Sequence, residues 1–341
     1  MDLALLADAL AAGGEPPYRT RQVWDWTARG AGGYASMTDL PLVLRERLDA
    51  EVPFSTLTVR AQSQSSDGTV KVLFDTADAR PLETVLMRYR DGRRSLCLSS
   101  QSGCPLTCSF CATGAMRFAR NLSASEILDQ ALHFRRTAPI SNCVFMGMGE
   151  PMLNLDAVLD ACERLPALGI GHRHTTVSTV GWIPGIERLA GSAMPLRLAL
   201  SLHAAEDALR SELMPVNERY PLADVIEACR AFYARRRRRI FVEYVMLAGV
   251  NDRYEQALAL ARLLDSGGRS AEGRTAEHGA AIFKVNLIPY NPTGAGFSGS
   301  SRHSIAAFCE ALRERGIDVT VRLTRGRDIA AACGQLAARV P

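Results

Sequence analysis

Three cysteines lie close together at Cys104, Cys108 and Cys111, in the segment GCPLTCSFCATG (103–114). In a loop, this spacing lets three thiolates point at one centre, which a regular helix or strand does not allow. Iron–sulfur cubanes normally take four thiolates, so three local ligands leave one iron open to another molecule. The alternative is a structural zinc site, which needs a fourth ligand. The nearest other cysteines in the sequence are Cys97 and the distant Cys143.

Composition and location decide how the nine cysteines are interpreted. Of 341 residues, 47% are hydrophobic and 22% are charged, which is typical of a folded globular protein. Residues 1–12 are apolar but lack the basic start of a signal peptide, and no stretch is long enough to span a membrane. We therefore expect a cytoplasmic protein, in which clustered cysteines favour metal or redox chemistry over disulfides. The net charge of +4 permits an RNA partner without requiring one.

The elements that must position these cysteines follow a repeating pattern. Short apolar, β-branched runs alternate with helical segments, at Ser95–Leu98, Cys143–Met146, Thr175–Ser178, Leu196–Leu200, Phe241–Met246 and Phe283–Ile288. This alternation predicts right-handed βαβ units and a parallel sheet of about six strands. The expected fold class is α/β, with the sheet curled into a full or partial barrel and the active site at the carboxyl ends of its strands.

Unusual residues follow the ends of five of these six strands. They are Cys104, Gly147–Pro151, Ser178–Thr179, Ser201–His203 and Asn291. Because the carboxyl ends of parallel strands meet at one edge of a sheet, we expect these residues to converge on one mouth.

The rest of the chain divides into two flanking regions. Residues 1–54 read as a small helical domain, with contact to RNA as one interpretation of its surface, and residues 55–92 as a linker with a β-hairpin formed by Thr69–Phe74 and Thr84–Met87. Residues 93–341 then form the barrel and a C-terminal catalytic segment.

Three segments outside the cysteine motif carry a second interpretation. Aromatic and basic residues alternate in Tyr18–Trp26, which favours either an RNA-facing surface or the core of the helical domain. Arg235–Arg239 is either a solvated helix face or a phosphate contact. Ser266–Gly279, rich in Gly, Ser and Glu, predicts a surface loop.

The cysteine triplet is the signature of the radical S-adenosylmethionine (SAM) superfamily, and the chain resembles the RlmN-type adenosine C2 methyltransferases along its whole length. The stretches that carry this resemblance are SSQSGC (99–104), FMGMGEP (145–151), SLHA (201–204), LMPVN (213–217), VNLIP (285–289) and ACGQL (332–336), together with YRTRQ (18–22). The resemblance implies a partial (β/α)6 TIM-like barrel of the radical SAM type with a small N-terminal helical domain.

The resemblance also implies the cofactors: a [4Fe-4S] cluster on the three cysteines and SAM, two molecules per turnover. Gly149 and Glu150 match the pair that binds the amino group of SAM, and a carboxylate suits a cationic amine. The remaining cofactor contacts match Ser178, Ser201, Leu202, His203 and Asn291. For His203 the alternative is a packed core histidine.

Two further cysteines define the chemistry that the resemblance implies. Cys333 matches the cysteine that carries a methyl group to the substrate, and small residues flank it, as the approach of a nucleobase requires. Cys97 matches the cysteine that then attacks the Cys333 sulfur, releasing the product and leaving a disulfide. Glu83 matches the base that removes the C2 proton, with a surface strand glutamate as the alternative. Without the resemblance, either cysteine reads as a buried hydrophobic residue, as we interpret the remaining Cys143, Cys162, Cys229 and Cys309.

The implied substrate is an adenosine in 23S rRNA and possibly one in tRNA, unstacked so that its base enters the barrel mouth. The expected partners are this RNA and an electron donor such as flavodoxin or ferredoxin, with no membrane partner and a monomeric state.

Two alternatives remain at this point. The first is a Cfr-type enzyme, which methylates C8 and confers antibiotic resistance; Pro151 after Gly149-Glu150 resembles the C2 group instead. The second is a non-catalytic, metal-containing RNA-binding protein, which has no need for Cys97, Glu150 and Cys333 in one chain.

Overall fold

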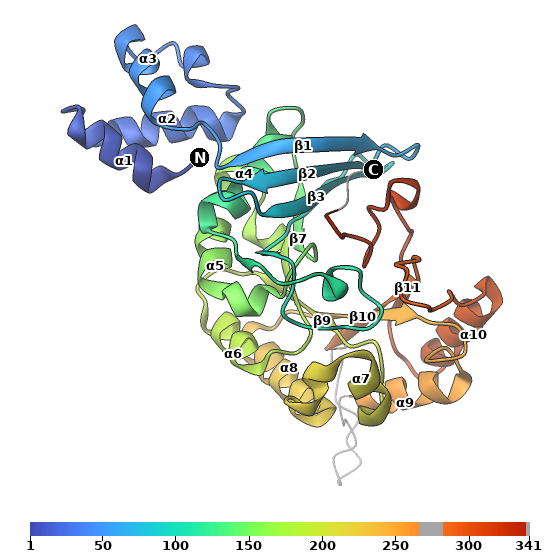
Figure 1. Ribbon diagram of the computed structural model, residues 1–341. Coiled ribbons are helices and arrows are strands. Elements are labelled where there is room, and N and C mark those ends of the chain that lie inside the picture. The colour runs from blue at the N-terminus through green and yellow to red at the C-terminus, as the bar shows by residue number, and fades with distance from the viewer. Residues whose placement is uncertain (266–281, 339–341) are drawn as a thin grey trace.

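A ten-stranded sheet forms the centre of the molecule. The computed structural model describes residues 1–265 and 282–338, and the strands are ordered β1-β2-β3-β4-β7-β8-β9-β10-β11-β12 (Figure 1). Their bounds are β1 Leu57–Gln64, β2 Val70–Thr76, β3 Pro81–Arg88, β4 Arg94–Cys97, β7 Asn142–Phe145, β8 Thr175–Thr179, β9 Arg197–Ser201, β10 Ile240–Met246, β11 Phe283–Pro289 and β12 Val319–Val321. A separate pair, β5 Gln101–Ser102 and β6 Arg120–Asn121, lies beside the cysteine loop.

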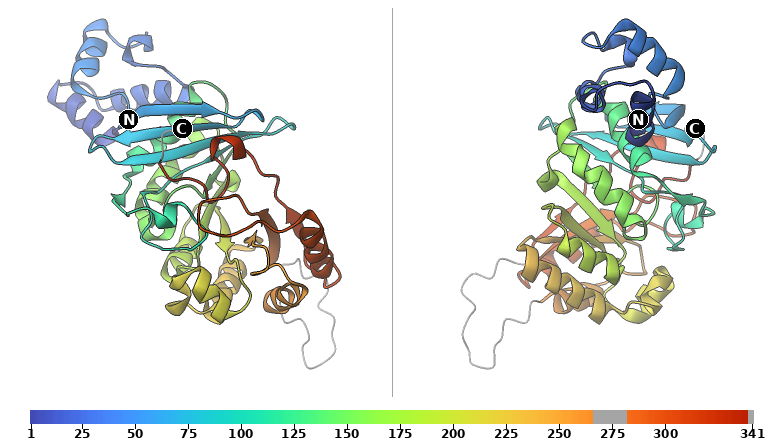
Figure 2. Two further views of the ribbon diagram at one scale, coloured as in Figure 1. Left: turned by 45° about the vertical axis from the view of Figure 1, so that its right-hand side comes forward. Right: turned by 90° about the vertical axis from the view of Figure 1, so that its left-hand side faces the viewer.

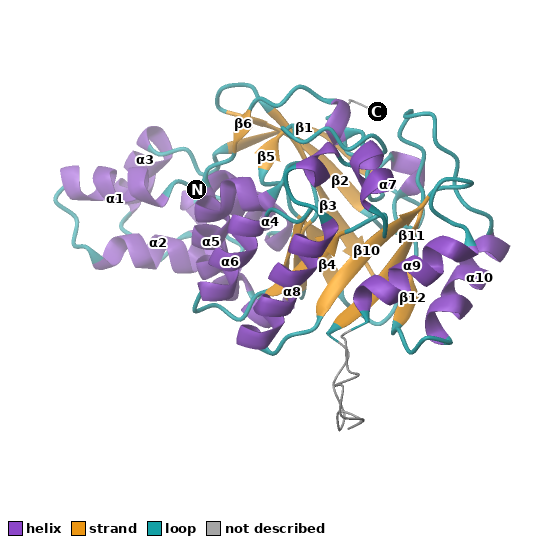
Figure 3. Ribbon diagram, turned by 90° about the horizontal axis from the view of Figure 1, so that it is seen from below, coloured by secondary structure: helices purple, strands orange, loops and turns teal. Residues whose placement is uncertain are grey.

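From β4 to β12 all strand pairs are parallel, which confirms the predicted α/β fold. Helices cover the outer face of this half of the sheet (Figure 3). They are α4 Ala124–Arg135, α5 Leu155–Arg164, α6 Ile183–Gly191, α8 Leu222–Arg236, α9 Tyr254–Leu264 and α10 Arg302–Arg313, with the short α7 Asp207–Leu213 near the carboxyl ends of the strands. The sheet does not close, because β1 and β12 are both edges, so the barrel is partial as expected.

The six predicted parallel strands are all present, and a seventh, β12, was not predicted. It has three residues, two of them exposed, which is too short for a hydrophobic pattern to reveal. Short 3-10 turns complete the structure: η1 Tyr34–Ser36, η2 Thr113–Ala115, η3 Pro151–Asn154, η4 Leu165–Leu168, η5 His172–His174, η6 Pro215–Glu218 and η7 Arg327–Ile329.

The region between the helical domain and the barrel is an antiparallel extension of the same sheet. The predicted hairpin is present as β2 and β3, and β3 pairs with β4 so that Val85 lies opposite Cys97. The expectation of two strands was incomplete, because β1 adds a third. Most residues of β1 are exposed, so its sequence lacks the apolar alternation of a half-buried strand.

The N-terminal helices α1 Leu3–Ala12, α2 Tyr18–Arg29 and α3 Leu42–Glu51 stand apart from the barrel around a core of their own (Figures 1 and 2). Trp26 packs against this core, as the core interpretation predicts, whereas Trp24 packs against the core of the barrel instead. Tyr18 is 59% exposed, so that interpretation is wrong for this residue. Whether these helices contact RNA, and the domain boundaries themselves, stay predictions.

The arginine run Arg235–Arg239 spans the end of α8 and the loop before β10. Arg236 donates to two backbone carbonyls, and Arg239 pairs with Asp318 at 2.8 Å. These arginines therefore lie at the amino end of β10, the opposite end from the predicted mouth, and a phosphate contact there stays a prediction. The loop expected at 266–279 lies outside the described residues. Within the described part of the chain, no helix is long and apolar enough to cross a membrane.

Candidate active site

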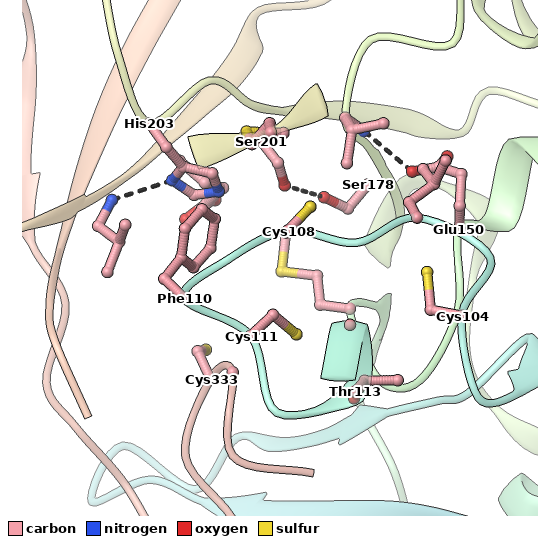
Figure 4. A pocket seen from close by; sticks show the side chains of 18 of the residues that line it. Cys104, Cys108, Phe110, Cys111, Thr113, Glu150, Ser178, Ser201, His203 and Cys333 are labelled. Carbon is pink, nitrogen blue, oxygen red and sulfur yellow. Dashed lines mark hydrogen bonds between the residues drawn. The ribbon is translucent and has the colours of Figure 1, made fainter. Parts of the chain in front are cut away.

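Cys104, Cys108 and Cys111 lie on one loop that curves around a cavity of about 160 Å³, here called the first cavity (Figure 4). The loop is anchored by backbone hydrogen bonds from Ser109 to the Leu213 carbonyl, at 2.9 Å, and from Ala112 to a carbonyl near the C-terminus. It is too tight for a side chain at Gly114, where a Cβ would lie 2.8 Å from the Cys108 carbonyl oxygen.

The three thiols fit an iron–sulfur cluster better than a single ion. Within residues 1–265 and 282–338, no group of three His, Cys, Asp or Glu side chains is gathered tightly enough to hold one metal ion. The thiolates of a cubane bind separate irons, so they need not converge on one point. Burial raises the pKa of Cys104 to about 12 and that of Cys108 further, so their thiolates need a positive centre in the cavity.

Gly149 and Glu150 follow β7 and line the first cavity. Gly149 has a φ of 99°, and a Cβ there would lie 2.6 Å from the Gln101 side chain. The buried Glu150 carboxylate accepts hydrogen bonds from the amides of Val180, at 2.9 Å, and Met152, at 3.1 Å. Burial nevertheless raises the pKa of Glu150 to about 7. A cationic amine in this cavity would stabilise its charged form, as the predicted role requires.

Ser178, Ser201 and His203, at the ends of β8 and β9, also line the first cavity, so these two strand ends meet the end of β7 and the cysteine loop here, as expected. The two serine Oγ atoms lie 3.3 Å apart. His203 has a φ of 61°, and its Nδ1 accepts a hydrogen bond from the Val245 amide at 3.0 Å. Burial, with Arg210 nearby, lowers its pKa to about 3, so the ring is neutral.

Two predicted cofactor contacts, Leu202 and Asn291, do not line the first cavity. Leu202 is completely buried, and its amide donates to the Glu243 carbonyl at 3.0 Å. Asn291 lines a neighbouring cavity, and its Nδ2 donates to the Cys333 carbonyl at 3.3 Å. Its buried Oδ1 has no hydrogen-bond partner within the described part of the chain, and so can accept one from a ligand.

This neighbouring cavity, here called the second cavity, has a volume of about 540 Å³ and contains both accessory cysteines. Cys97 and Cys333 line it together with Cys111. Cys333 also lines the first cavity, so it stands at the junction of the two (Figure 4). Burial raises the pKa of Cys97 to about 12, and the proximity of the Cys333 thiol contributes.

Cys333 lies on a segment, residues 325–338, that has almost no regular structure of its own; we call it the Cys333 segment. A turn between β1 and β2 holds it from one side. Asp328 accepts hydrogen bonds from the Ser65 hydroxyl, at 2.6 Å, and the Ser66 amide, at 3.1 Å, while Asp67 accepts from the Gly326 amide at 3.1 Å. The cysteine loop holds it from the other side, where the Thr113 hydroxyl donates to the Leu336 carbonyl at 2.6 Å.

Glu83, the predicted base, lines neither cavity and is completely buried in β3. Its Oε1 lies 2.8 Å from the Lys71 Nζ, and its Oε2 accepts hydrogen bonds from the amides of Ala337 and Ala338 at 2.8 and 3.0 Å. Lys71 also donates to the Ala330 carbonyl at 3.3 Å. The surface-glutamate alternative is therefore wrong, since this buried ion pair anchors the Cys333 segment.

Several residues that organise the site escaped sequence reasoning. Arg210, a completely buried side chain, donates to the Leu202 carbonyl at 3.2 Å and the Asn217 Oδ1 at 2.7 Å. Asn217 belongs to a motif that carried the resemblance, but nothing marked Arg210. Arg322 pairs with the buried Glu243 at 3.1 Å, with one nitrogen 4.0 Å from the Cys333 sulfur. The predicted core cysteines Cys143, Cys162, Cys229 and Cys309 are all buried, as expected.

Comparison with known proteins agrees with this geometry. Residues 98–261 match the radical SAM superfamily. A probable dual-specificity RNA methyltransferase RlmN from Chloroflexus aurantiacus is 47% identical, over 99% of this chain and 92% of its own length. The dual-specificity RNA methyltransferase RlmN of Anaeromyxobacter dehalogenans is 44% identical, over 98% of this chain and 89% of its own.

A solved structure of a radical SAM methyltransferase from Sphaerobacter thermophilus superposes with a TM-score of 0.90 at 44% identity, covering 99% of this chain and 98% of that one. Matches that cover 99% of this chain include the helical domain and the Cys333 segment as well as the barrel. The chain therefore belongs to the RlmN family of radical SAM RNA methyltransferases.

Proposed function

We propose that this protein methylates C2 of an adenosine in 23S rRNA and in tRNA, through a methyl group carried on Cys333. The observation that carries the proposal is the position of Cys333, which borders the first cavity with the three cluster cysteines and the second cavity with Cys97. A methyl group on this sulfur can face the cofactor on one side and the substrate base on the other. The relatives named as dual-specificity RNA methyltransferases support an RNA substrate.

The chemistry needs a radical route because adenine C2 is electron-poor and has no nucleophilic lone pair. The [4Fe-4S] cluster and SAM, when bound, supply the means to abstract hydrogen from a methyl group. Glu150 would bind the SAM amine, and Cys104, Cys108 and Cys111 would hold the cluster. We expect two SAM molecules per turnover, one of them to methylate Cys333.

The residues of the second cavity complete the reaction. Once the methylene carbon on Cys333 is joined to the base, the Cys97 thiolate forms an S–S bond with the Cys333 sulfur. The S–C bond breaks, and its electron pair stays with the carbon, which takes up a proton. An external reductant then returns the disulfide to two thiols. We expect electrons from a small donor such as flavodoxin or ferredoxin, and a monomeric enzyme.

Removal of the C2 proton is assigned to Glu83, acting as a base, because of the family resemblance. Its Oε2 is bound by the amides of Ala337 and Ala338, so this role requires those peptide groups to withdraw when RNA enters. The choice of C2 over C8 rests on Pro151, which follows Glu150 as in the C2 group.

A Cys97→Ala variant tests the proposal. Without the resolving thiol, the RNA should stay covalently attached to Cys333, and peptide mass spectrometry after nuclease digestion would detect an adenosine adduct on that residue. Cys143→Ala, which alters a buried cysteine outside both cavities, is the matched control and should release methylated RNA.

Analysis of the wild-type product separates the alternatives. An 8-methyladenosine product would sink the C2 assignment and favour the Cfr-type reaction. If reduced, reconstituted protein gave neither 5′-deoxyadenosine nor methylated Cys333, the non-catalytic RNA-binding alternative would replace the proposal.

A further inference from the structure

The exposed part of the second cavity is lined by cations. Arg93, Lys284, Arg322 and Arg325 contribute to its wall, and no aspartate or glutamate does so among the residues that the structure describes. The same cavity is lined by Cys97 and, at its junction with the first cavity, by Cys333. An anionic molecule that enters here would reach the two reactive sulfurs.

Tyr89 contacts two of these cations at the edge of the second cavity that lies toward the amino end of β4. The guanidinium of Arg93 lies over its ring at 4.6 Å from the centroid, and that of Arg325 at 5.3 Å. Each cation–π contact is worth roughly 0.5–1 kcal/mol at an exposed site. The two guanidiniums come from distant parts of the chain, the β3–β4 turn and the Cys333 segment, and both contact this one ring.

The acidic partners of these cations leave them available to another anion. Arg93 and Asp91 pair at 2.7 Å, but both side chains are more than half exposed. Arg325 lies 3.9 Å from Asp67 and Lys284 lies 3.6 Å from Asp318, whereas Arg322 is held at 3.1 Å by the buried Glu243. The Arg93–Asp91 pair is exposed, and pairs of this kind typically contribute roughly 0–1 kcal/mol, so a phosphate can compete with that carboxylate. The Arg325–Asp67 pair is too long for a hydrogen bond, which leaves the Arg325 donors free to turn to a phosphate.

We propose that Tyr89, Arg93 and Arg325 form a phosphate-binding rim that holds the RNA backbone beside the target adenosine while its base occupies the second cavity. The inference rests on the proposed function and adds the surface that RNA contacts. Arginine pairs with phosphate oxygens through a planar fork, which suits a backbone that must be held in one orientation. Leu323, 78% exposed on the same wall, offers an apolar surface for a neighbouring base.

An acidic electron-transfer protein is the other partner that such a rim could attract. The extent of the second cavity favours RNA, because this one space of about 540 Å³ is lined both by the cations and by Cys97 and Cys333. Of the three cluster cysteines, which an electron must approach, Cys111 borders both cavities, whereas Cys104 and Cys108 line only the first. A rim that served electron delivery alone would not need to surround the second cavity.

The test compares Arg93→Ala and Arg325→Ala with Arg188→Ala in the full-length, cluster-loaded enzyme. Arg188 is a suitable control because it is exposed and paired with Asp156 on the outer helices. The measurement is the Kd for an RNA stem–loop carrying the target adenosine, over a series of salt concentrations. Unfolding midpoints would show that the variants are folded.

Each rim variant should raise the Kd by about tenfold and lower the slope of log K against log salt by about 0.7, the value for one lost phosphate contact on single-stranded RNA. Tyr89→Leu should raise the Kd as well. Unchanged affinity and slope in both arginine variants, or an equal loss in Arg188→Ala, would overturn the rim. Slower reduction of the cluster by an acidic donor protein, with RNA affinity intact, would also overturn it and assign the rim to that partner. Failure of the wild-type enzyme to bind or methylate RNA would instead refute the proposed function.

Discussion

Replacing Lys71 by methionine isolates the contribution of the buried ion pair to the Cys333 segment. The Lys71 and Glu83 side chains are only 7% and 0% exposed, and their charged atoms lie 2.8 Å apart. Methionine keeps much of the lysine volume and removes the charge. The Glu83 carboxylate then stays buried with two backbone amides as its remaining hydrogen-bond donors.

The expected cost is about 3–5 kcal/mol in the free energy of unfolding, because removal of one partner leaves a buried charge without its counter-charge. The double variant Lys71→Met/Glu83→Gln removes both charges and keeps an oxygen to accept from Ala337 and Ala338. It should therefore be more stable than Lys71→Met. Arg60→Met is the matched control, since Arg60 pairs with Asp75 between neighbouring strands but is 39% exposed; its cost should not exceed about 1 kcal/mol.

Two measurements check this reasoning. Urea denaturation gives the free energies of unfolding of the four proteins. Alkylation with iodoacetamide, followed by peptide mapping, gives the reaction rate of the Cys333 thiol, which should rise in Lys71→Met as the segment loosens. A loss below 1 kcal/mol, no better than that of Arg60→Met, would refute the role of the pair, as would an unchanged alkylation rate in a destabilised variant.

Three further variants test the geometry of the first cavity. The pKa of His203 falls from 6.5 to about 3 on folding, so the wild-type free energy of unfolding should fall by up to about 1.4 kcal/mol per pH unit between pH 6.5 and pH 3. His203→Asn, in which asparagine tolerates the left-handed backbone, should remove this acid sensitivity, as denaturation at several pH values would show. Gly149→Ala should abolish SAM binding in calorimetry, since its Cβ would lie 2.6 Å from Gln101; binding within threefold of wild type would contradict the tight turn. Arg210→Met should cost more than about 2 kcal/mol, because buried carbonyls lose their donor; a smaller loss in urea denaturation would contradict its anchoring role.

The sequence predicted the barrel well because its signals are local and periodic. Each of the six predicted parallel strands is a short apolar run between helices, and burial on both faces of the sheet requires that pattern. The same logic fails for β1 and β12, whose residues are largely exposed. Because the carboxyl ends of parallel strands meet at one edge of a sheet, the sequence also predicted that one cavity would gather Cys104, Glu150, Ser178 and His203.

What the sequence could not predict depends on contacts between distant residues. Glu83 reads as a possible base or a surface residue until its pairing with Lys71 and the segment after Cys333 is known. Asn291 and Leu202 follow the right strands, but side-chain direction sends one toward the second cavity and the other into the core. Buried Arg210 carries no local signal, because its partners come from several different loops.

The irregular backbone of the Cys333 segment has a consequence for dynamics. Left-handed conformations recur at Gly326, Ala330, Gly334 and Ala338, so no helix or strand ladder runs through it. When the Cys333 segment moves away from the barrel, it breaks its separate anchoring contacts and leaves the hydrogen bonds between the strands of the sheet intact. Local opening of this kind costs far less than global unfolding. Cys333 thus sits on a low-stability unit of the protein, whose amides should exchange with deuterium earlier than those of the sheet beneath it.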